Sequence, residues 1–335
     1  MSHTDDLLLR FIAPAPEPCR YLGDVEIHQT LLSAPANYLD FLWQRLSAVA
    51  DGSISLQLPE KQIFEDGPLQ GDFRIMPCIT LTNGVPFKTV KVVGTNLNQR
   101  IVPGQITVGK AMVLDPVENF VTHMADANLL SSLRTGACAA LAMRSHHAGQ
   151  GCLRIVGAGK VGTYTALLAL ETLAFSELRL TDRNQGRVQE LAELLRHRHP
   201  GVAIKMVEPG AMARGEDVVV LTTTSEAPFF SPRHTDAPLV ISLGADSRHQ
   251  RELTDDWVSA AELCCESLDS MDYGDLLAWR DGGLLDGDLP TAWLARLAGR
   301  VSDDADAPGH QRQVFISTGS ALMDNLTLNY LLAQL

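Results

Sequence analysis

The stretch that decides the fold is Cys152-Leu-Arg-Ile-Val-Gly-Ala-Gly-Lys-Val-Gly162. Its apolar start, residues 153–156, predicts a buried strand, and the apolar segment 161–175 has the length of a helix. Between the two lies the G-x-G-x-x-G pattern of a dinucleotide-binding turn. This order of strand, turn and helix predicts a cofactor site at Gly157, Ala158, Gly159, Lys160, Val161 and Gly162.

Each glycine of this turn has a separate physical role. Gly157 allows the tight turn, Gly159 lets the backbone approach a pyrophosphate, and Gly162 lets the helix pack close to the strand. The first turn of the helix then offers free N–H groups and the positive end of its dipole to the phosphates. The alternative is a glycine-rich turn in an α/β domain that binds no nucleotide.

A second strand, residues 178–182, ends in an acid. Asp182 can accept hydrogen bonds from both ribose hydroxyls of NAD and would repel a 2′-phosphate. Its neighbour Arg183 could pair with that phosphate if the acid turned away. We therefore predict NAD as the cofactor, with NADP possible.

The bulk composition limits the class of protein. The chain has 335 residues, enough for two domains, and its hydrophobic (45%) and charged (20%) fractions are those of a globular protein. A formal charge of -13 and the lack of a basic run argue against nucleic acid. The scattered cysteines predict no metal or disulfide framework. We expect a soluble, cytoplasmic protein with no signal peptide and no membrane span.

The pattern changes along the chain. Residues 7–12 are a possible strand, a helix is expected at 38–49, and strand patterns follow at 54–58, 73–77, 86–93 and 111–114. From residue 126 onward helices and strands alternate, which predicts a doubly wound parallel sheet of the Rossmann type. Because the nucleotide unit starts so late, the β-rich first third is expected to serve substrate binding and oligomerisation.

Three stretches place polar side chains in positions suited to chemistry. Lys88 and Lys91 flank a β-branched run, and alternation on a strand sends them to opposite faces, so only one points inward. Arg134 sits in an apolar helix, where it either extends to solvent or binds a carboxylate. Asp246 follows a predicted strand at the sheet edge where ligands bind. It could exchange protons during C–N chemistry, or cap a helix.

A further polar group follows another strand of the predicted sheet. Thr222, Thr223 and Thr224 come directly after the apolar run 218–221. At that edge they could contact the nicotinamide ribose, or cap the next turn.

Taken together, these motifs resemble the ornithine cyclodeaminase/μ-crystallin family. The resemblance spans roughly residues 70–325 in family order, and its most specific part is the arginine-threonine segment ahead of the glycine turn. It is carried by Met76-Pro77, Lys91-Val-Val-Gly-Thr95, Leu133-Arg-Thr-Gly-Ala137, Ile155-Val-Gly-Ala-Gly159, Leu243-Gly-Ala-Asp246, Arg251-Glu-Leu253 and Val314-Phe-Ile-Ser-Thr-Gly319.

The resemblance implies roles for these residues. Lys91, rather than Lys88, and Arg134 match the residues that contact the substrate carboxylate. Asp246 matches the general acid/base, and Asp182 the ribose-binding acid. Weaker matches give Lys61 and Thr107 to the substrate site and Gly319 to the cofactor site.

The resemblance also implies an architecture. A β-rich α+β substrate and dimerisation domain comprises residues 1–125 with 313–335, and a Rossmann domain comprises residues 126–312. Family members are commonly dimers whose N-terminal sheets join, so we expect a homodimer.

Two departures from the family bear on the substrate. Many cyclodeaminases carry an acid two residues before Met76-Pro77, where this chain has Arg74. If Arg74 faces the site, a cationic ornithine side chain fits poorly and an acidic or keto-acid substrate fits better. Arg248 and His249 also replace the Pro-Gly that usually follows the acid/base.

The predicted function is NAD-dependent chemistry at the α-carbon of an amino acid through an imine. The expected branch is an amino-acid dehydrogenase, a ketimine reductase or an opine-like enzyme. An ornithine cyclodeaminase that releases ammonia and recycles NAD is the first alternative. A nucleotide-bound binding protein of the μ-crystallin type, with little turnover, is the alternative from another class.

Overall fold

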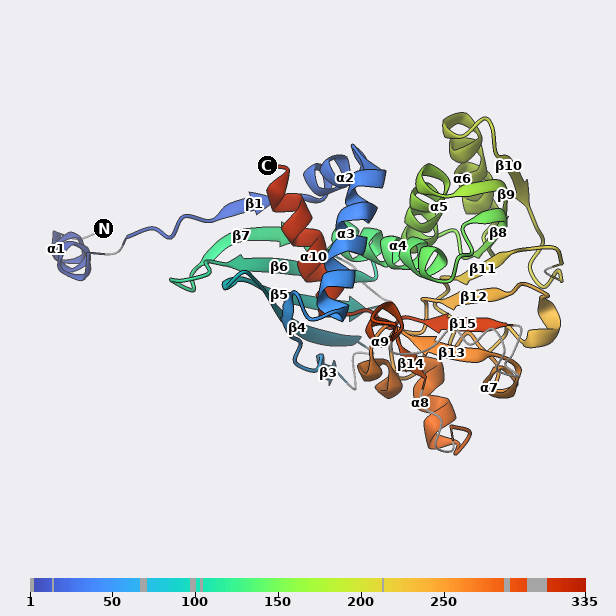
Figure 1. Cartoon of the computed structure of the whole chain (residues 1–335). Coiled ribbons are helices and arrows are strands. Elements are labelled where there is room, and N and C mark those ends of the chain that lie inside the picture. The colour runs from blue at the N-terminus through green and yellow to red at the C-terminus, as the bar shows by residue number, and fades with distance from the viewer. Residues whose placement is uncertain are drawn as a thin grey trace.

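The computed structural model describes residues 3–13, 15–66, 71–96, 101–102, 105–212, 214–285, 290–299 and 312–335. Within these ranges the strands form two sheets, one 7-stranded and one 8-stranded (Figure 1). No helix in this part of the chain is long and apolar enough to cross a membrane.

The 8-stranded sheet is parallel throughout, with strand order β10-β9-β8-β11-β12-β15-β13-β14. This confirms the predicted doubly wound Rossmann sheet. Its strands are β8 (Gln150–Val156), β9 (Ala174–Thr181), β10 (Ala203–Met206), β11 (Val218–Leu221), β12 (Leu239–Ser242), β13 (Glu262–Cys265), β14 (Thr291–Ala292) and β15 (Gln313–Ile316).

Helices connect and cover these strands. They are α4 (Ala127–Ser145), α5 (Lys160–Thr172), α6 (Gln185–Arg198), α7 (Trp257–Ala260), α8 (Gly274–Asp281) and α9 (Trp293–Leu297), with 3-10 turns η2 (Pro232–His234) and η3 (Leu268–Asp272). Helices α4 and α5 pack at close range because Gly136 has no side chain. A Cβ there would lie 2.7 Å from the backbone nitrogen of Thr165.

The 7-stranded sheet is formed by the first third of the chain. Its central strands are antiparallel, and β1 pairs parallel with β7 at the edge. The strands are β1 (Arg20–Leu22), β2 (Ser55–Gln57), β3 (Gln62–Asp66), β4 (Gly71–Thr82), β5 (Val85–Asn96), β6 (Thr107–Leu114) and β7 (Val121–Asp126). Helices α2 (Asp24–Leu32), α3 (Pro35–Ala50) and α10 (Ala321–Ala333) lie on one side of it (Figure 1).

The strand expected at residues 7–12 is wrong. These residues belong to helix α1 (His3–Ile12), which lies apart from the body of the molecule (Figure 1). A strand needs a neighbour to satisfy its backbone groups, whereas a helix satisfies its own. Acids in the first turn, and an ion pair of 3.2 Å between Arg10 and Asp6, suit a helix.

The C-terminal segment crosses from one sheet to the other. Strand β15 lies between β12 and β13 in the 8-stranded sheet, while α10 packs against β4 and β5. The expected domain boundary at residue 313 assigns β15 to the first domain, whereas β15 belongs to the 8-stranded sheet of the second. A crossing after Ile316 follows the sheets better, and the division into two domains stays a prediction.

Candidate functional site

The glycine turn has the backbone geometry that a dinucleotide site requires. Gly157 has φ of +115°, and a Cβ on Gly162 would lie 1.9 Å from the carbonyl oxygen of Gly157. A Cβ on Gly159 would meet nothing within 4 Å, so this position is open on the side where a pyrophosphate approaches. These three residues fit the predicted cofactor.

The acid after β9 reaches back to this turn. Oδ2 of Asp182 accepts a hydrogen bond of 2.7 Å from the backbone nitrogen of Ala158, and Oδ1 accepts one of 2.8 Å from Asn184. A carboxylate has about four acceptor positions, so it can also accept from a ribose. Arg183, beside it, is exposed.

The ends of β11 and β12 are tied together by one buried acid. Glu252 accepts hydrogen bonds from Thr223 (2.6 Å from its nitrogen, 2.8 Å from its hydroxyl), from the hydroxyl of Ser242 (2.8 Å) and from the nitrogen of Gly244 (2.9 Å). Burial raises its pKa to about 7, although the hydrogen bonds lower it. This acid therefore fixes the loop that carries Thr223 relative to the loop that carries Asp246.

Two of the predicted substrate residues pair with the same buried acid. Lys91 on β5 and Arg134 on α4 both pair with Asp324 on α10, at 2.5 Å (Nζ to Oδ2) and 3.0 Å (Nε to Oδ1). All three side chains are buried, and Nη1 of Arg134 is a buried donor with no acceptor among the described residues. Burial lowers the pKa of Lys91 to about 8, although the charge of Asp324 raises it.

Arg74 pairs with Asp246, the predicted acid/base, while its contact with a substrate stays a prediction. Its guanidinium donates to Asp72 (2.8 Å from Nε) on the same strand and to Asp246 (3.0 Å from Nη1). Burial raises the pKa of Asp246. The charges of Arg74 and Lys61, together with the hydrogen bond from Arg74, lower it by more, so the net pKa lies below the ordinary value. Asp246 is therefore ionised at neutral pH.

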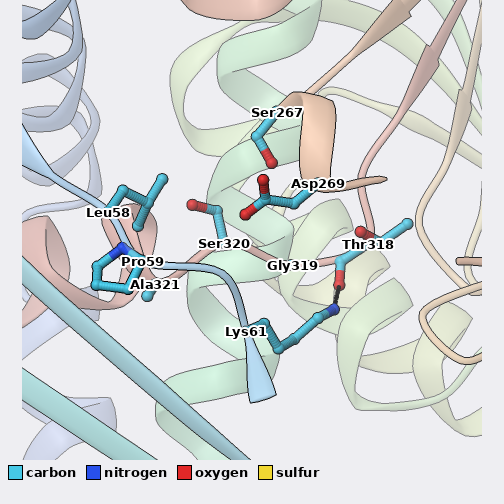
Figure 2. A pocket seen from close by; sticks show the side chains of 9 residues that line it. All are labelled: Leu58, Pro59, Lys61, Ser267, Asp269, Thr318, Gly319, Ser320 and Ala321. Atoms are coloured by element: carbon cyan, nitrogen blue, oxygen red, sulfur yellow. Dashed lines mark hydrogen bonds between the residues drawn. The ribbon is translucent and has the colours of Figure 1, made fainter. Parts of the chain in front are cut away.

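Lys61 is the one cation of this cluster that pairs with no carboxylate among the described residues. Figure 2 shows its side chain reaching the carbonyl of Thr318, 3.0 Å from Nζ, in a pocket that Asp269 and Ser320 also line. Its ammonium lies 3.7 Å from the centre of the Tyr273 ring, a cation–π contact. Burial and the charge of Arg74 lower the pKa of Lys61 to about 7.

The remaining predicted positions lie around this cluster. Lys88 points away from Lys91, as alternation required, and donates to the carbonyl of Pro116 (2.7 Å). The carbonyl of Thr107 accepts from Asn128 (2.9 Å), which itself accepts from Lys160 (2.7 Å), so Thr107 lies near the glycine turn.

Three more predicted cofactor positions can be placed. The hydroxyl of Thr222 donates to the carbonyl of Gly157 (3.0 Å), and Thr224 is exposed. Gly319 has φ of +81°, and a Cβ on it would lie 2.8 Å from Nη2 of Arg134. This glycine therefore makes room for the arginine, while its contact with a cofactor stays a prediction.

The sequence analysis missed three acids of the site: Asp72, Glu252 and Asp324. Asp72 lies two residues before Arg74 on β4, and that alternation is a signal the sequence does contain. Glu252 stands inside the Arg251-Glu-Leu253 motif but carried no assigned role. Asp324 is 190 residues from Arg134.

Comparison with known proteins places the chain in a family and a fold. The sequence model of the ornithine cyclodeaminase/mu-crystallin family matches residues 22–332. The iminosuccinate reductase of Paracoccus denitrificans is 24% identical over 233 residues, which are 68% of this chain and 70% of that protein.

Solved structures share the whole architecture. Δ1-pyrroline-2-carboxylate reductase of Thermococcus litoralis, bound to NADH and L-proline, matches with a TM-score of 0.82 and 18% identity over 94% of this chain and 97% of that one. A lysine cyclodeaminase matches with a TM-score of 0.77 and 23% identity over 95% and 92%. At these identities the likeness shows the fold.

Proposed function

Because the chain belongs to the ornithine cyclodeaminase/mu-crystallin family, we propose that it is an NAD-dependent oxidoreductase acting at the α-carbon of an amino acid through an imine. The named relatives fit this chemistry, since one reduces an imine by its name and another was solved with NADH. The preferred reaction is that of an amino-acid dehydrogenase or imine reductase, in which hydride is not returned to the same substrate as in a cyclodeaminase.

One observation carries the proposal, namely that the charged side chains of the site form two clusters of opposite sign. Lys91, Arg134 and Asp324 together carry one net positive charge, and Asp72, Asp246 and Arg74 carry one net negative charge. A zwitterionic amino acid has the complementary arrangement. Nη1 of Arg134, which has no acceptor in the described part of the chain, suits its carboxylate, and Asp246 suits its ammonium or iminium nitrogen.

The chemistry follows from these positions. Gly157, Gly159 and Asp182 would hold the cofactor, and NAD bound there would supply hydride transfer. Lys91 and Arg134 hold the substrate carboxylate and so orient the α-carbon. Asp246 is ionised, so it takes the proton that the ammonium loses on oxidation and returns it on imine reduction.

Arg74 favours the dehydrogenase or reductase over the cyclodeaminase. A cyclodeaminase must bind a second amine beside the first, and this chain has Arg74 where many cyclodeaminases carry an acid. Its ion pairs with Asp72 and Asp246 fix it in the site.

A substrate panel tests the proposal. NAD⁺ is offered with amino acids of acidic, neutral and basic side chain, and NADH absorbance and ammonia are followed together. Equal amounts of NADH and ammonia are expected; ammonia without net NADH would instead mean a cyclodeaminase. If neither product appears, NADH oxidation is followed with keto acids plus amines and with cyclic imines. No NADH oxidation in that second assay would mean a nucleotide-bound binding protein.

We also propose that two copies associate through the face of the 7-stranded sheet that no described helix covers. Helices cover one side of this sheet (Figure 1), while Phe64, Phe73 and Leu81 on the other are 44%, 47% and 38% exposed. An apolar patch of this kind marks an interface. Sedimentation should show a dimer that Phe73→Glu dissociates; a monomeric parent protein would contradict this.

The state of the cysteines bears on the cellular compartment of the protein. All six cysteines are free, five of them buried, as suits the reducing cytoplasm. We place the protein there, with its substrate domain built from the first sheet and α10 and its cofactor domain from the second.

A further inference from the structure

Asp324 lies where three distant segments meet. It sits in the first turn of α10, its side chain is 2% exposed, and it forms ion pairs with Lys91 on β5 and Arg134 on α4. No role in binding or chemistry attaches to it from the motifs above. Its position between the two cations makes it the residue that decides their spacing.

The carboxylate is held in place by its neighbours on the helix. Asn325 donates to the carbonyl of Phe87 (3.1 Å) and to the hydroxyl of Thr89 (3.0 Å), and it accepts from Thr80 (2.9 Å). These buried bonds fix α10 on β4 and β5 independently of the ion pairs. Asp324 is therefore presented to Lys91 by a rigid support.

Without the Asp324 carboxylate, the positive charges of Lys91 and Arg134 would repel each other with nothing between them to offset the repulsion. Lys91 and Arg134 are both buried, and like charges at close range in a poorly solvated site repel strongly. An arginine keeps its proton under such conditions, whereas a lysine gives it up. Burial lowers the pKa of Lys91 to about 8, and Asp324 is the largest influence that opposes this.

We propose that Asp324 is a positioning residue that keeps Lys91 protonated and holds it beside Arg134, leaving the pair with one positive charge for a substrate carboxylate. The binding part of this inference rests on the proposed function. The protonation part concerns the protein alone and holds whatever the substrate is.

Other groups near Lys91 do not replace Asp324. Arg74 on β4 carries the same charge as Lys91 and lowers its pKa further. Cys78 on β4 and Tyr38 on α3 are also within reach of the charge of Asp324. Burial is the main cause that raises the pKa of Cys78 to about 12 and raises the pKa of Tyr38, and the charge of Asp324 raises both further. Both are neutral in the working range, so Asp324 is the carboxylate that sets the charge of Lys91.

The first test measures the protonation of Lys91 directly. The full chain is labelled with 13Cε-lysine, whose shift follows protonation, and the Lys91 signal is assigned with Lys91→Arg. The six lysines are Lys61, Lys88, Lys91, Lys110, Lys160 and Lys205. In Asp324→Asn we expect the Lys91 midpoint at least one pH unit lower than in the parent protein. An unchanged midpoint overturns the proposal.

The second test measures the consequence for binding, with the best substrate of the panel. Asp324→Asn should lose at least about sixfold more kcat/KM at pH 8.5 than at pH 6.5, mostly through KM. A midpoint that falls from about 8 to about 7 lowers the protonated fraction of Lys91 about eightfold at pH 8.5 and only slightly at pH 6.5. In a Lys91→Arg background the loss should be the same at both pH values. A loss in the single variant that is equal at both pH values means a merely structural role.

A matched control separates the specific effect of Asp324 on Lys91 from the general effects of removing a carboxylate. Asp40 pairs with Arg144 at 2.7 Å on the surface, and Asp40→Asn should change neither the Lys91 midpoint nor kcat/KM. If the parent protein transfers no hydride, the proposed function fails while the Lys91 midpoint still decides the role of Asp324.

Discussion

Replacing Lys61 with methionine should make the protein more stable at neutral pH while weakening substrate binding. Lys61 is a partly buried cation without a carboxylate partner among the described residues, and desolvation with the charge of Arg74 lowers its pKa from 10.5 to about 7. Methionine fills a similar volume and needs no charge. The gain in stability and the loss of binding would have the same cause, a cation kept in the site for an anionic ligand.

The magnitude and its sign follow from proton linkage. Lysine in the unfolded chain keeps its proton up to about pH 10.4, so between pH 7 and that value the unfolded chain binds more protons than the folded one. The stability of the parent protein therefore rises with pH, whereas Lys61→Met lacks this contribution. The stability advantage of Lys61→Met should shrink by about 2 kcal/mol between pH 7 and pH 9.

Urea unfolding followed by tryptophan fluorescence at pH 7, 8 and 9 measures this difference. Lys205→Met is the matched control, because Lys205 is 56% exposed in its pair with Glu177 and should show no such trend. A Lys61→Met variant that is less stable than the parent protein at pH 7, or whose advantage does not change with pH, would refute the reasoning.

Three further substitutions test the cofactor turn and the acid/base. Gly159→Ala should leave thermal stability unchanged, since its Cβ has open space, yet weaken NADH binding at least about tenfold by fluorescence titration, because the methyl group occupies the approach of the pyrophosphate. Asp182→Ser should shift the ratio of NADH to NADPH affinity toward NADPH by about tenfold in the same titration. Arg74→Met removes the charge that lowers the pKa of Asp246, so the acid limb of the pH–rate profile should move to higher pH; an unmoved limb would assign that limb to another group.

Local patterns explain what the sequence could predict. The strand, turn and helix around Gly157 follow one another directly, so the fingerprint and the parallel sheet were readable. Alternation along β5 also separated Lys91 from Lys88 correctly. The run 7–12 was misassigned because apolar residues in succession fit a strand or a helix, and the absence of a neighbouring strand is not a local property.

Contacts between distant segments explain what could not be predicted. Asp324 reads in sequence as an acid near the start of a helix, where it would suit the dipole of any helix. Its role depends on Lys91 and Arg134 arriving from two other elements. Likewise, the pairing of Arg74 with Asp246 joins β4 to the loop after β12, across 172 residues.

The most direct test of the central claim is to follow the hydride. NADH carrying deuterium on the transferred C4 position is incubated with the protein and the keto acid and amine, or the imine, that the panel identifies, and the amino-acid product is examined by mass spectrometry and NMR. The account predicts one deuterium on the α-carbon for each NADH oxidised, and its loss in Asp246→Asn together with the turnover. NADH oxidation that leaves no deuterium on the α-carbon, or full turnover in Asp246→Asn, would contradict it.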